Sequence, residues 1–480
     1  MTTLASTTVD LARLQFALTS IYHFLFVPLT LGLAPLVAVM QTLWHRTHDD
    51  SWLRLTRFFG TLLLINFAIG VATGLVQEFQ FGMSWSVYSN FVGGVFGAPL
   101  AIEGMAAFMV EATFLGLWIF GWDRLAPKVH LATIWIAALA SWLSAYLILV
   151  ANSWMQHPVG YKIVDGKAQL TSLSALLSNH FALTAWLHTI LAGLIFGSMV
   201  MLGVACWHFL RGRNVALFRH AAKLALIVAV PATLVQLSVG NRFGAAVTSA
   251  QGMKIAASEA QWNTCQPCGF SVFQIGGFSA QDPDPKFAIT IPRLLSWMAT
   301  GSFDGKVEGL NQLQKTEQRK YGSGNYMPRV RLMYWSMRVM AILGVTMFLI
   351  AAVGAWLYRR QTLHKARWCL RIAVVAIAFP YIAATAGWIL TEMGRQPWIV
   401  QDLLKTSEAV SPSLSTATVA TSVSVFAVLY VALGVVDFTL MRRYARVDPP
   451  QAGEGGGLGA TAGVPETATA LSYGAGSRDA

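Results

Sequence analysis

The chain has 480 residues, of which 55% are hydrophobic and only 12% are charged, and its mean hydropathy is +0.54. This composition is typical of a membrane protein rather than a soluble domain. The formal net charge of +12 does not indicate a nucleic-acid-binding protein, because the positive residues lie at the ends of apolar runs and in one loop, where membrane topology explains them.

Nine apolar runs are long enough to cross a bilayer core as helices, which takes about 20 residues each. Their length and continuity favour helices over barrel strands, which are short and alternate in polarity. In chain order the runs cover residues 17–44, 58–79, 96–120, 130–152, 180–210, 216–241, 331–357, 370–391 and 413–441. The predicted fold class is therefore all-α, a polytopic membrane bundle of about nine transmembrane helices.

The positive residues of the short loops predict how this bundle is oriented. With the N-terminus outside, seventeen Lys and Arg residues lie on the inner side, whereas the N-terminus and the short outer loops hold five. We therefore expect an outer N-terminus and a cytoplasmic C-terminus. The first helix serves as its own signal, because no cleavable signal peptide is evident.

Two segments differ from the apolar runs. Residues 243–328 are mixed in charge and rich in Gly, Pro, Asn and Gln, which predicts an outer loop with structure of its own. It separates helices 1–6, within residues 1–242, from helices 7–9, within residues 329–446. Residues 447–480 are dominated by small residues and proline, which predicts a disordered cytoplasmic tail.

Ionisable residues inside apolar spans are costly to bury, so each is a candidate functional residue. Each also has a structural interpretation, as a packed histidine or as a protonated acid that joins two helices. Glu103 and Glu111 lie about 80° apart around one helix, so they can line one side of it as a proton relay or as such a structural pair. In chain order the candidates are His23, Glu103, Glu111, His188, Arg338 and Glu392.

His188 and Met340 lie at similar predicted depths. At 1.5 Å per residue they are about 12 Å and about 14 Å inside the outer ends of spans that run in the same direction. An imidazole and a thioether form a known axial pair for low-spin haem iron. Methionine in an apolar helix is more often a packing residue, so depth alone leaves both interpretations open.

Five long segments resemble subunit I of the cytochrome bd quinol oxidases, and the resemblance runs from about residue 10 to residue 445. Apolar helices that match by chance would share hydrophobicity, but not the buried Glu and His residues or a Gly-Arg-Gln-Pro-Trp string. The segments are RLQFALTSIYHFLFVPLTLG at 13–32, EFQFGMSWSVYSNFVGGVFGAPLAIEG at 78–104, FGWDRL at 120–125, ILVANSWMQHP at 148–158 and GWILTEMGRQPW at 387–398.

The resemblance implies an enzyme of the bacterial inner membrane. Such an oxidase takes electrons from membrane quinol at its outer face and reduces dioxygen to water, with protons drawn from the cytoplasm and no pumping. It also implies a homologous subunit II as partner and a small single-helix accessory subunit. Whether the substrate is ubiquinol or menaquinol stays open.

The resemblance further implies three haems. His188 and Met340 would ligate haem b558, with Arg338 beside one of its propionates. His23 would ligate haem d and Glu392 would ligate haem b595, although these two assignments differ within the family. Loading of haem d rather than haem b is also left open.

Four other positions of the spans match functional positions of the family. Glu103 would lie near the oxygen site, Glu111 and Ser144 would lie on the proton route, and Trp388 would lie among the high-spin haems.

The outer loop resembles the short form of the family's quinol-binding loop. Its string KIAASEAQW, at 254–262, places Lys254 and Glu259 at the two substrate-associated positions. Cys265 and Cys268 depart from the family pattern. They form a redox-active disulfide, a local staple or two free thiols, and a metal site would need two further ligands that the sequence does not offer nearby.

Two other functions stay open at this stage. A proton-coupled transporter would use Glu103, Glu111 and Glu392 as ion sites and would carry no visible chromophore. A structural homologue of subunit II would lack haem, but the set formed by His23, His188, Met340 and Glu392 argues against it.

Overall fold

Nine helical segments are long and apolar enough to cross a membrane within residues 2–450, the part of the chain that the computed structural model describes. They correspond one for one to the nine predicted runs, so the helix bundle is confirmed. The segments are Thr7–Thr47, Asp50–Met83, Ser86–Phe120, Pro127–Gln156, Leu173–Arg211, Val215–Ala250, Val330–Arg359, Arg367–Gly394 and Thr416–Tyr444.

Several of these segments consist of more than one helix. The first is divided near Leu25 and Phe26, and the second residue of α2 is Pro28, which has no backbone N–H to lose at a helix start. The third contains the π-helix η1, and π-helical turns are frequent at functional sites. The composite segments are α1 (Thr2–Phe24) with α2 (Val27–Thr47), α4 (Ser86–Ile102) with η1 (Glu103–Phe108) and α5 (Met109–Phe120), α7 (Leu173–Leu177) with α8 (His180–Arg211), and α14 (Arg367–Val375) with α15 (Ala378–Gly394).

The remaining spans are single helices: α3 (Asp50–Met83), α6 (Pro127–Gln156), α9 (Val215–Ala250), α13 (Val330–Arg359) and α16 (Thr416–Tyr444). Helix α9 continues to Ala250, past the predicted boundary at residue 242, so the outer segment begins at residue 251. The extension carries three alanines, which favour a helix, whereas the sequence boundary followed the loss of continuous hydrophobicity.

Helices α2 and α8 cross at three glycines. A Cβ added at Gly32 would lie 1.8 Å from the carbonyl oxygen of Gly193, and one added at Gly197 would lie 2.7 Å from the carbonyl carbon of Gly32. Small residues permit such close approach between helices in a membrane. Helix α8 also packs against α9, and α13 packs against both α9 and α15.

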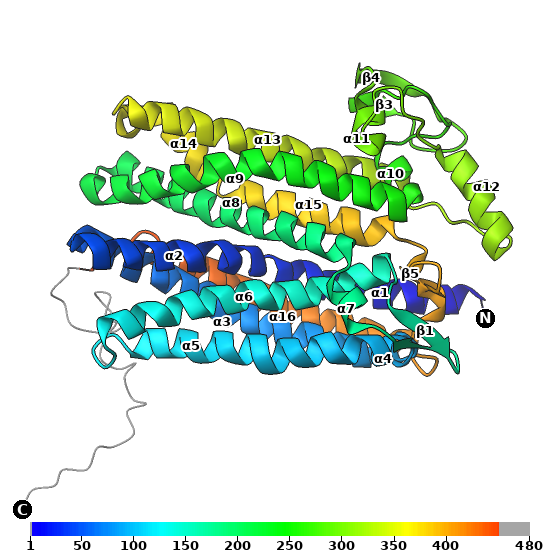
Figure 1. Ribbon diagram of the computed structural model, residues 1–480, viewed down its shortest axis with the longest axis horizontal. Coiled ribbons are helices and arrows are strands. Elements are labelled where there is room, and N and C mark those ends of the chain that lie inside the picture. The colour runs from blue at the N-terminus through cyan, green and yellow to red at the C-terminus, as the bar shows by residue number, and fades with distance from the viewer. Residues whose placement is uncertain (1, 451–480) are drawn as a thin grey trace, which may run out of the picture.

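The segment between α9 and α13 has structure of its own, as predicted. Figure 1 shows β3, β4, α11 and α12 at the end of the bundle where the N-terminus lies, so this segment and the N-terminus share one side. Which side faces the cytoplasm stays a prediction. The segment contains α10 (Gly252–Ser258), the antiparallel pair β3 (Phe270–Gly276) and β4 (Pro285–Ile291), α11 (Leu294–Thr300) and α12 (Leu310–Tyr321).

Short elements join the other helices. They are the hairpin β1 (Tyr161–Val164) and β2 (Lys167–Leu170), the pair β5 (Trp398–Val400) and β6 (Leu404–Lys405), and the 3₁₀ turns η2 (Leu363–Lys365) and η3 (Thr406–Glu408).

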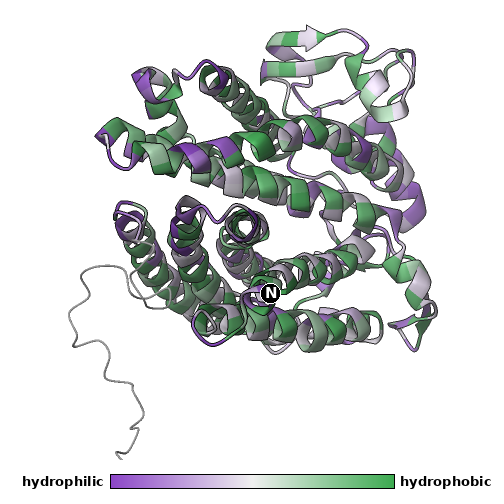
Figure 2. Cartoon of the chain, turned by 60° about the vertical axis from the view of Figure 1, so that its left-hand side comes forward, coloured by the Kyte–Doolittle hydropathy of each residue, from purple (hydrophilic) through white to green (hydrophobic). Residues whose placement is uncertain are grey.

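The surface and the C-terminal region fit a membrane bundle. Figure 2 shows hydrophobic residues along the helices and hydrophilic residues gathered at their ends. Of the predicted disordered tail, residues 451–480 lie outside the described residues. The preceding residues are held by Arg54, which donates to the carbonyl oxygens of Pro449 and Pro450, and by Asn214, which donates to Asp448.

Candidate functional site

A cavity of about 450 Å³ lies between α1, α3, η1, α6 and α15. Its size falls in the range of small-molecule and cofactor pockets, roughly 300–1,000 Å³. The cavity brings together candidates from four separate spans. Those that line it are His23, Glu103, Glu111, Ser144, Trp388 and Glu392.

His23 lies at the end of α1, and its ring is oriented by α3. Its Nδ1 lies 3.1 Å from the hydroxyl of Thr73, which itself donates to the carbonyl oxygens of Ile69 and Gly70. The Thr73 oxygen therefore accepts the Nδ1 proton, and Nε2 keeps a free electron pair suited to a metal. A Cβ at Gly74 would lie 3.0 Å from Cε1 of this ring, so glycine keeps space beside it.

The two carboxylic acids of the third span both contact α6. Ser144 donates to Oε1 of Glu103 at 2.7 Å, and Ser141 donates to Oε1 of Glu111 at 2.6 Å. The sequence analysis associated Ser144 with Glu111, whereas the structure pairs Ser144 with Glu103. Ser141 was missed, although it lies one helical turn from Ser144 and therefore on the same face of α6.

Glu392 lies near the end of α15 and is held by two partners. Its Oε1 accepts a hydrogen bond from Nδ2 of Asn152 at 2.9 Å, and its Oε2 forms an ion pair with Arg395. Trp388, one turn earlier on α15, stacks on Phe24 with 4.9 Å between ring centroids. Phe24, which follows His23 in the chain, thus packs against α15, the helix that carries Glu392.

His188 lies on α8 and Met340 on α13, outside this cavity, and both helices pack against α9 and α15. Nε2 of Gln236 lies 3.1 Å from Nδ1 of His188. A Cβ added at Gly387 would lie 3.0 Å from Sδ of Met340, and one at Gly240 would lie 3.5 Å from Cε1 of His188. Glycine at these two positions leaves room for Met340 beside α15 and for His188 beside α9.

Arg338 and Glu259 form a buried bidentate ion pair. Nη1 lies 3.1 Å from Oε1 and Nη2 lies 2.7 Å from Oε2. Arg338 also donates to the carbonyl oxygens of Ser258 and Ser271, so every N–H of its guanidinium group has a partner. Burial raises the pKa of the Glu259 carboxyl, while Arg338 opposes this shift. Two residues predicted to serve haem and quinol separately therefore contact each other.

Lys254 is a residue of α10, and its side chain is buried against other helices than the one that Glu259 contacts. Its Nζ donates to Oε1 of Gln156 at 2.5 Å, and a Cβ at Gly394 would lie 2.5 Å from its Cγ. Burial lowers the pKa of this amine to about 7. The two predicted quinol residues are thus attached to different helices, Glu259 to α13 and Lys254 to α6 and α15.

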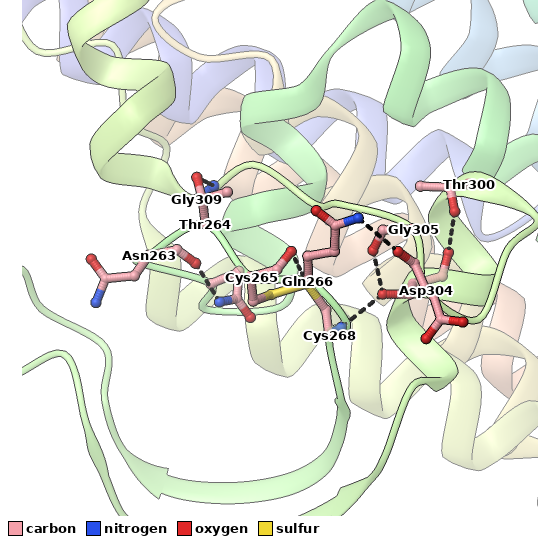
Figure 3. The surroundings of a disulfide bond; sticks show 11 residues. Asn263, Thr264, Cys265, Gln266, Cys268, Thr300, Asp304, Gly305 and Gly309 are labelled. Atoms are coloured by element: carbon pink, nitrogen blue, oxygen red, sulfur yellow. Dashed lines mark hydrogen bonds between the residues drawn. A yellow bond between two sulfur atoms is a disulfide. The ribbon is translucent and has the colours of Figure 1, made fainter.

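Cys265 and Cys268 form a disulfide bond, which excludes free thiols (Figure 3). The backbone of Cys265 pairs with Val307 in both directions, and the N–H of Cys268 donates to the hydroxyl of Ser296 at 2.7 Å. The disulfide therefore closes a small loop against α11 and the strand-like segment around Val307, as a local staple would.

The uncharged partners of the candidates were not predicted from the sequence. These residues were detectable, since each is a polar side chain within or next to an apolar run, but only ionisable side chains were taken as candidates. The missed residues are Thr73, Ser141, Asn152, Gln156 and Gln236.

Comparison with known proteins gives a consistent result. The family model described as cytochrome bd terminal oxidase subunit I matches residues 11–449. Cytochrome bd ubiquinol oxidase subunit 1 of Bacillus subtilis strain 168 is 42% identical over 425 residues, which cover 88% of this chain and 90% of that protein. Cytochrome bd-II ubiquinol oxidase subunit 1 of Escherichia coli strain K12 is 37% identical over 502 residues, with 92% and 97% covered.

The fold also matches a solved structure. The bd oxidase from Geobacillus thermodenitrificans superposes with a TM-score of 0.83 and 27% sequence identity, and the match covers 92% of this chain and 99% of that one. The predicted resemblance is therefore supported by sequence and by fold.

Proposed function

Because the chain belongs to the cytochrome bd terminal oxidase subunit I family, we propose that it is the haem-bearing subunit of a terminal quinol oxidase that reduces dioxygen to water. The observation that carries this proposal is the cavity, which unites His23, Glu103 and Glu392 with Trp388 in a multi-pass bundle of the same fold. Given this family assignment, no observation favours a proton-coupled transporter or a structural homologue of subunit II.

The candidate ligands suit three haems. His188 and Met340 would hold haem b558, His23 haem d and Glu392 haem b595. The free electron pair on Nε2 of His23 and the space beside Met340 and His188 support these roles. Bound haems would supply one-electron transfer between quinol and dioxygen. The full set of hydrogen bonds on Arg338 speaks against a direct role for it at a propionate.

The acids of the third span would deliver protons. Reducing one dioxygen to two waters consumes four electrons and four protons, so two quinols are oxidised in each cycle. Glu103 lies in the cavity with its carboxyl group on Ser144, and Glu111 lines the same cavity with its carboxyl group on Ser141. We propose that these acids pass cytoplasmic protons to the cavity, which makes the reaction electrogenic without a pump.

Quinol would bind at the outer end of the bundle, against α10. Lys254 and Glu259 are attached to opposite sides of this short helix, so a quinol headgroup bound there can affect both. The family implies a subunit II as partner. We further propose a small single-helix accessory subunit and a bacterial inner-membrane location.

The test is a reduced-minus-oxidised optical spectrum of the purified oxidase, before and after substitution of the low-spin ligands. Met340→Leu keeps a similar side-chain volume and removes the sulfur, so we expect the fold to persist while the low-spin haem band and quinol oxidation are lost. His188→Ala should give the same result. A parent protein without haem bands would refute the proposed function, and an unchanged low-spin band in Met340→Leu would remove Met340 from the ligand set.

A further inference from the structure

A chain of hydrogen bonds joins the outer segment to the cavity. Lys254 donates to Oε1 of Gln156 at 2.5 Å, and Nε2 of Gln156 donates to Oδ1 of Asn152 at 2.7 Å. Nδ2 of Asn152 then donates to Oε1 of Glu392 at 2.9 Å. Four side chains from α10, α6 and α15 are therefore connected without a break.

The direction of the donors is the same at every step. An ammonium group can only donate and an ionised carboxylate can only accept, whereas each amide between them accepts with its oxygen and donates with its nitrogen. The chain therefore starts on the amine of Lys254, which donates to Gln156, and ends on the carboxylate of Glu392, which accepts from Asn152. Hydrogen bonds arranged in series polarise one another, so a change at Lys254 alters the bond that reaches Glu392.

The positions of the two amides favour this connection. Asn152 and Gln156 are four residues apart on α6, so they lie on one face of that helix. Lys254 and Gln156 are almost fully buried, with 3% and 1% of their surface exposed. Water therefore has little access to replace the bond between them.

Arg395 completes the arrangement at the cavity. It forms an ion pair with Oε2 of Glu392 and donates to the carbonyl oxygen of Ile399 and to the sulfur of Met155. One carboxylate oxygen of Glu392 is thus fixed by Arg395, whereas the other depends on Asn152. Only the second oxygen is connected to the outer segment.

We propose that Asn152 and Gln156 are positioning residues that connect Lys254 to Glu392, so that quinol bound against α10 changes the hydrogen bond received by this carboxylate in the cavity. The inference rests on the proposed function and extends it, because it gives two uncharged residues a role in communication between the substrate site and a high-spin haem. Helix α10 is then connected to α13 through Arg338 and to α6 through Gln156.

The experiment uses the purified oxidase with its partner subunit and an alkyl hydroxyquinoline N-oxide, a quinol analogue that cannot be oxidised. We expect the analogue to shift the optical band or midpoint potential of the high-spin haem ligated by Glu392. In Gln156→Leu and Asn152→Leu most of that shift should be lost, because the series of hydrogen bonds is broken, while the analogue still binds and still perturbs the low-spin haem.

Two further variants separate transmission from folding. Gln156→Glu keeps an acceptor for Lys254 but has no N–H for Asn152, so the outer segment should stay docked while the high-spin shift is lost. Gln401→Leu is the matched control, since Gln401 accepts from Gln251 near α10 and is not part of the chain. It should respond as the parent does.

The outcomes are distinct. A high-spin shift of parental size in Gln156→Leu and Gln156→Glu overturns the inference, as does a parent protein whose high-spin haem ignores the analogue. A parent protein that carries no haem, or that does not oxidise quinol, refutes the proposed function itself and is recognised before any variant is made.

Discussion

At the scale of single residues, a neighbouring glycine can provide the space that a predicted ligand needs. A Cβ at Gly387 on α15 would lie 3.0 Å from Sδ of Met340. One at Gly344, one turn after Met340 on α13, would meet no atom within 4 Å. We expect Gly387→Ala to displace Met340 and to weaken or shift the low-spin haem band, and Gly344→Ala to leave it unchanged. Equal spectra for the two variants would show that the sulfur is not held at this position.

The amine of Lys254 gives a prediction about pH. Because burial lowers its pKa to about 7, the amine is mostly charged below this pH and mostly neutral above it. Only the neutral form can accept a proton released by quinol. Quinol-driven oxygen consumption should therefore rise as the pH increases through about 7, and Lys254→Arg should abolish this rise, since arginine does not deprotonate.

An artificial electron donor that bypasses quinol provides the control for this measurement. With that donor, neither the parent nor Lys254→Arg should show the rise through pH 7, because no proton has to be accepted from quinol. A profile that rises through pH 7 with quinol in Lys254→Arg as it does in the parent would exclude Lys254 as the base.

At the scale of helices, glycines at the crossing of α2 and α8 set how closely these two helices approach. A Cβ at Gly32 would lie 1.8 Å from the carbonyl oxygen of Gly193, so the helices must separate to accept even alanine. Overpacking of this kind costs about 1–3 kcal/mol. We expect Gly32→Ala to lower the thermal unfolding temperature of the detergent-solubilised protein. Gly116→Ala on α5, with open space at its Cβ, should not, and equal temperatures for both variants would contradict the close crossing.

The helices themselves were largely predictable, because about 20 continuous apolar residues admit few structures other than a span. Details within the spans were not. The break between α1 and α2, the π-helix that begins at Glu103 and the extension of α9 to Ala250 depend on local backbone hydrogen bonding. Average hydrophobicity carries no information about that bonding, so the sequence placed the spans correctly and their ends only approximately.

At the scale of the whole molecule, the cavity collects residues that are far apart in the sequence. His23 and Glu392 were identified because an ionisable group in an apolar span is rare and costly. Their partners Thr73 and Asn152 were not, since uncharged polar residues are common in helices and gain meaning only from the packing of α3 and α6. The sequence therefore yields the charged members of the site, and the structure supplies the groups that orient them.

Proton delivery to this cavity is a property of the whole bundle, and Glu111 is the residue that tests it. Its carboxyl group is buried, lines the cavity and accepts a hydrogen bond from Ser141. If the acid only joins α5 to α6, Glu111→Gln should turn over normally, because the amide oxygen still accepts that bond. If it relays protons, glutamine cannot lose and regain one.

We expect Glu111 to act as a proton relay. Glu111→Gln should retain its haems and bind quinol, but in reconstituted vesicles it should reduce dioxygen and move charge at least about tenfold more slowly, an effect typical of losing an acid–base group. Ser141→Ala is the matched variant, since it removes the hydrogen bond and leaves the carboxyl group in place. It should lose less activity than Glu111→Gln. Near-normal turnover in Glu111→Gln, or an equal loss in both variants, would leave Glu111 with a structural role. Only a proton relay needs the carboxyl group itself, whereas a structural role needs only the hydrogen bond that Ser141 donates to it.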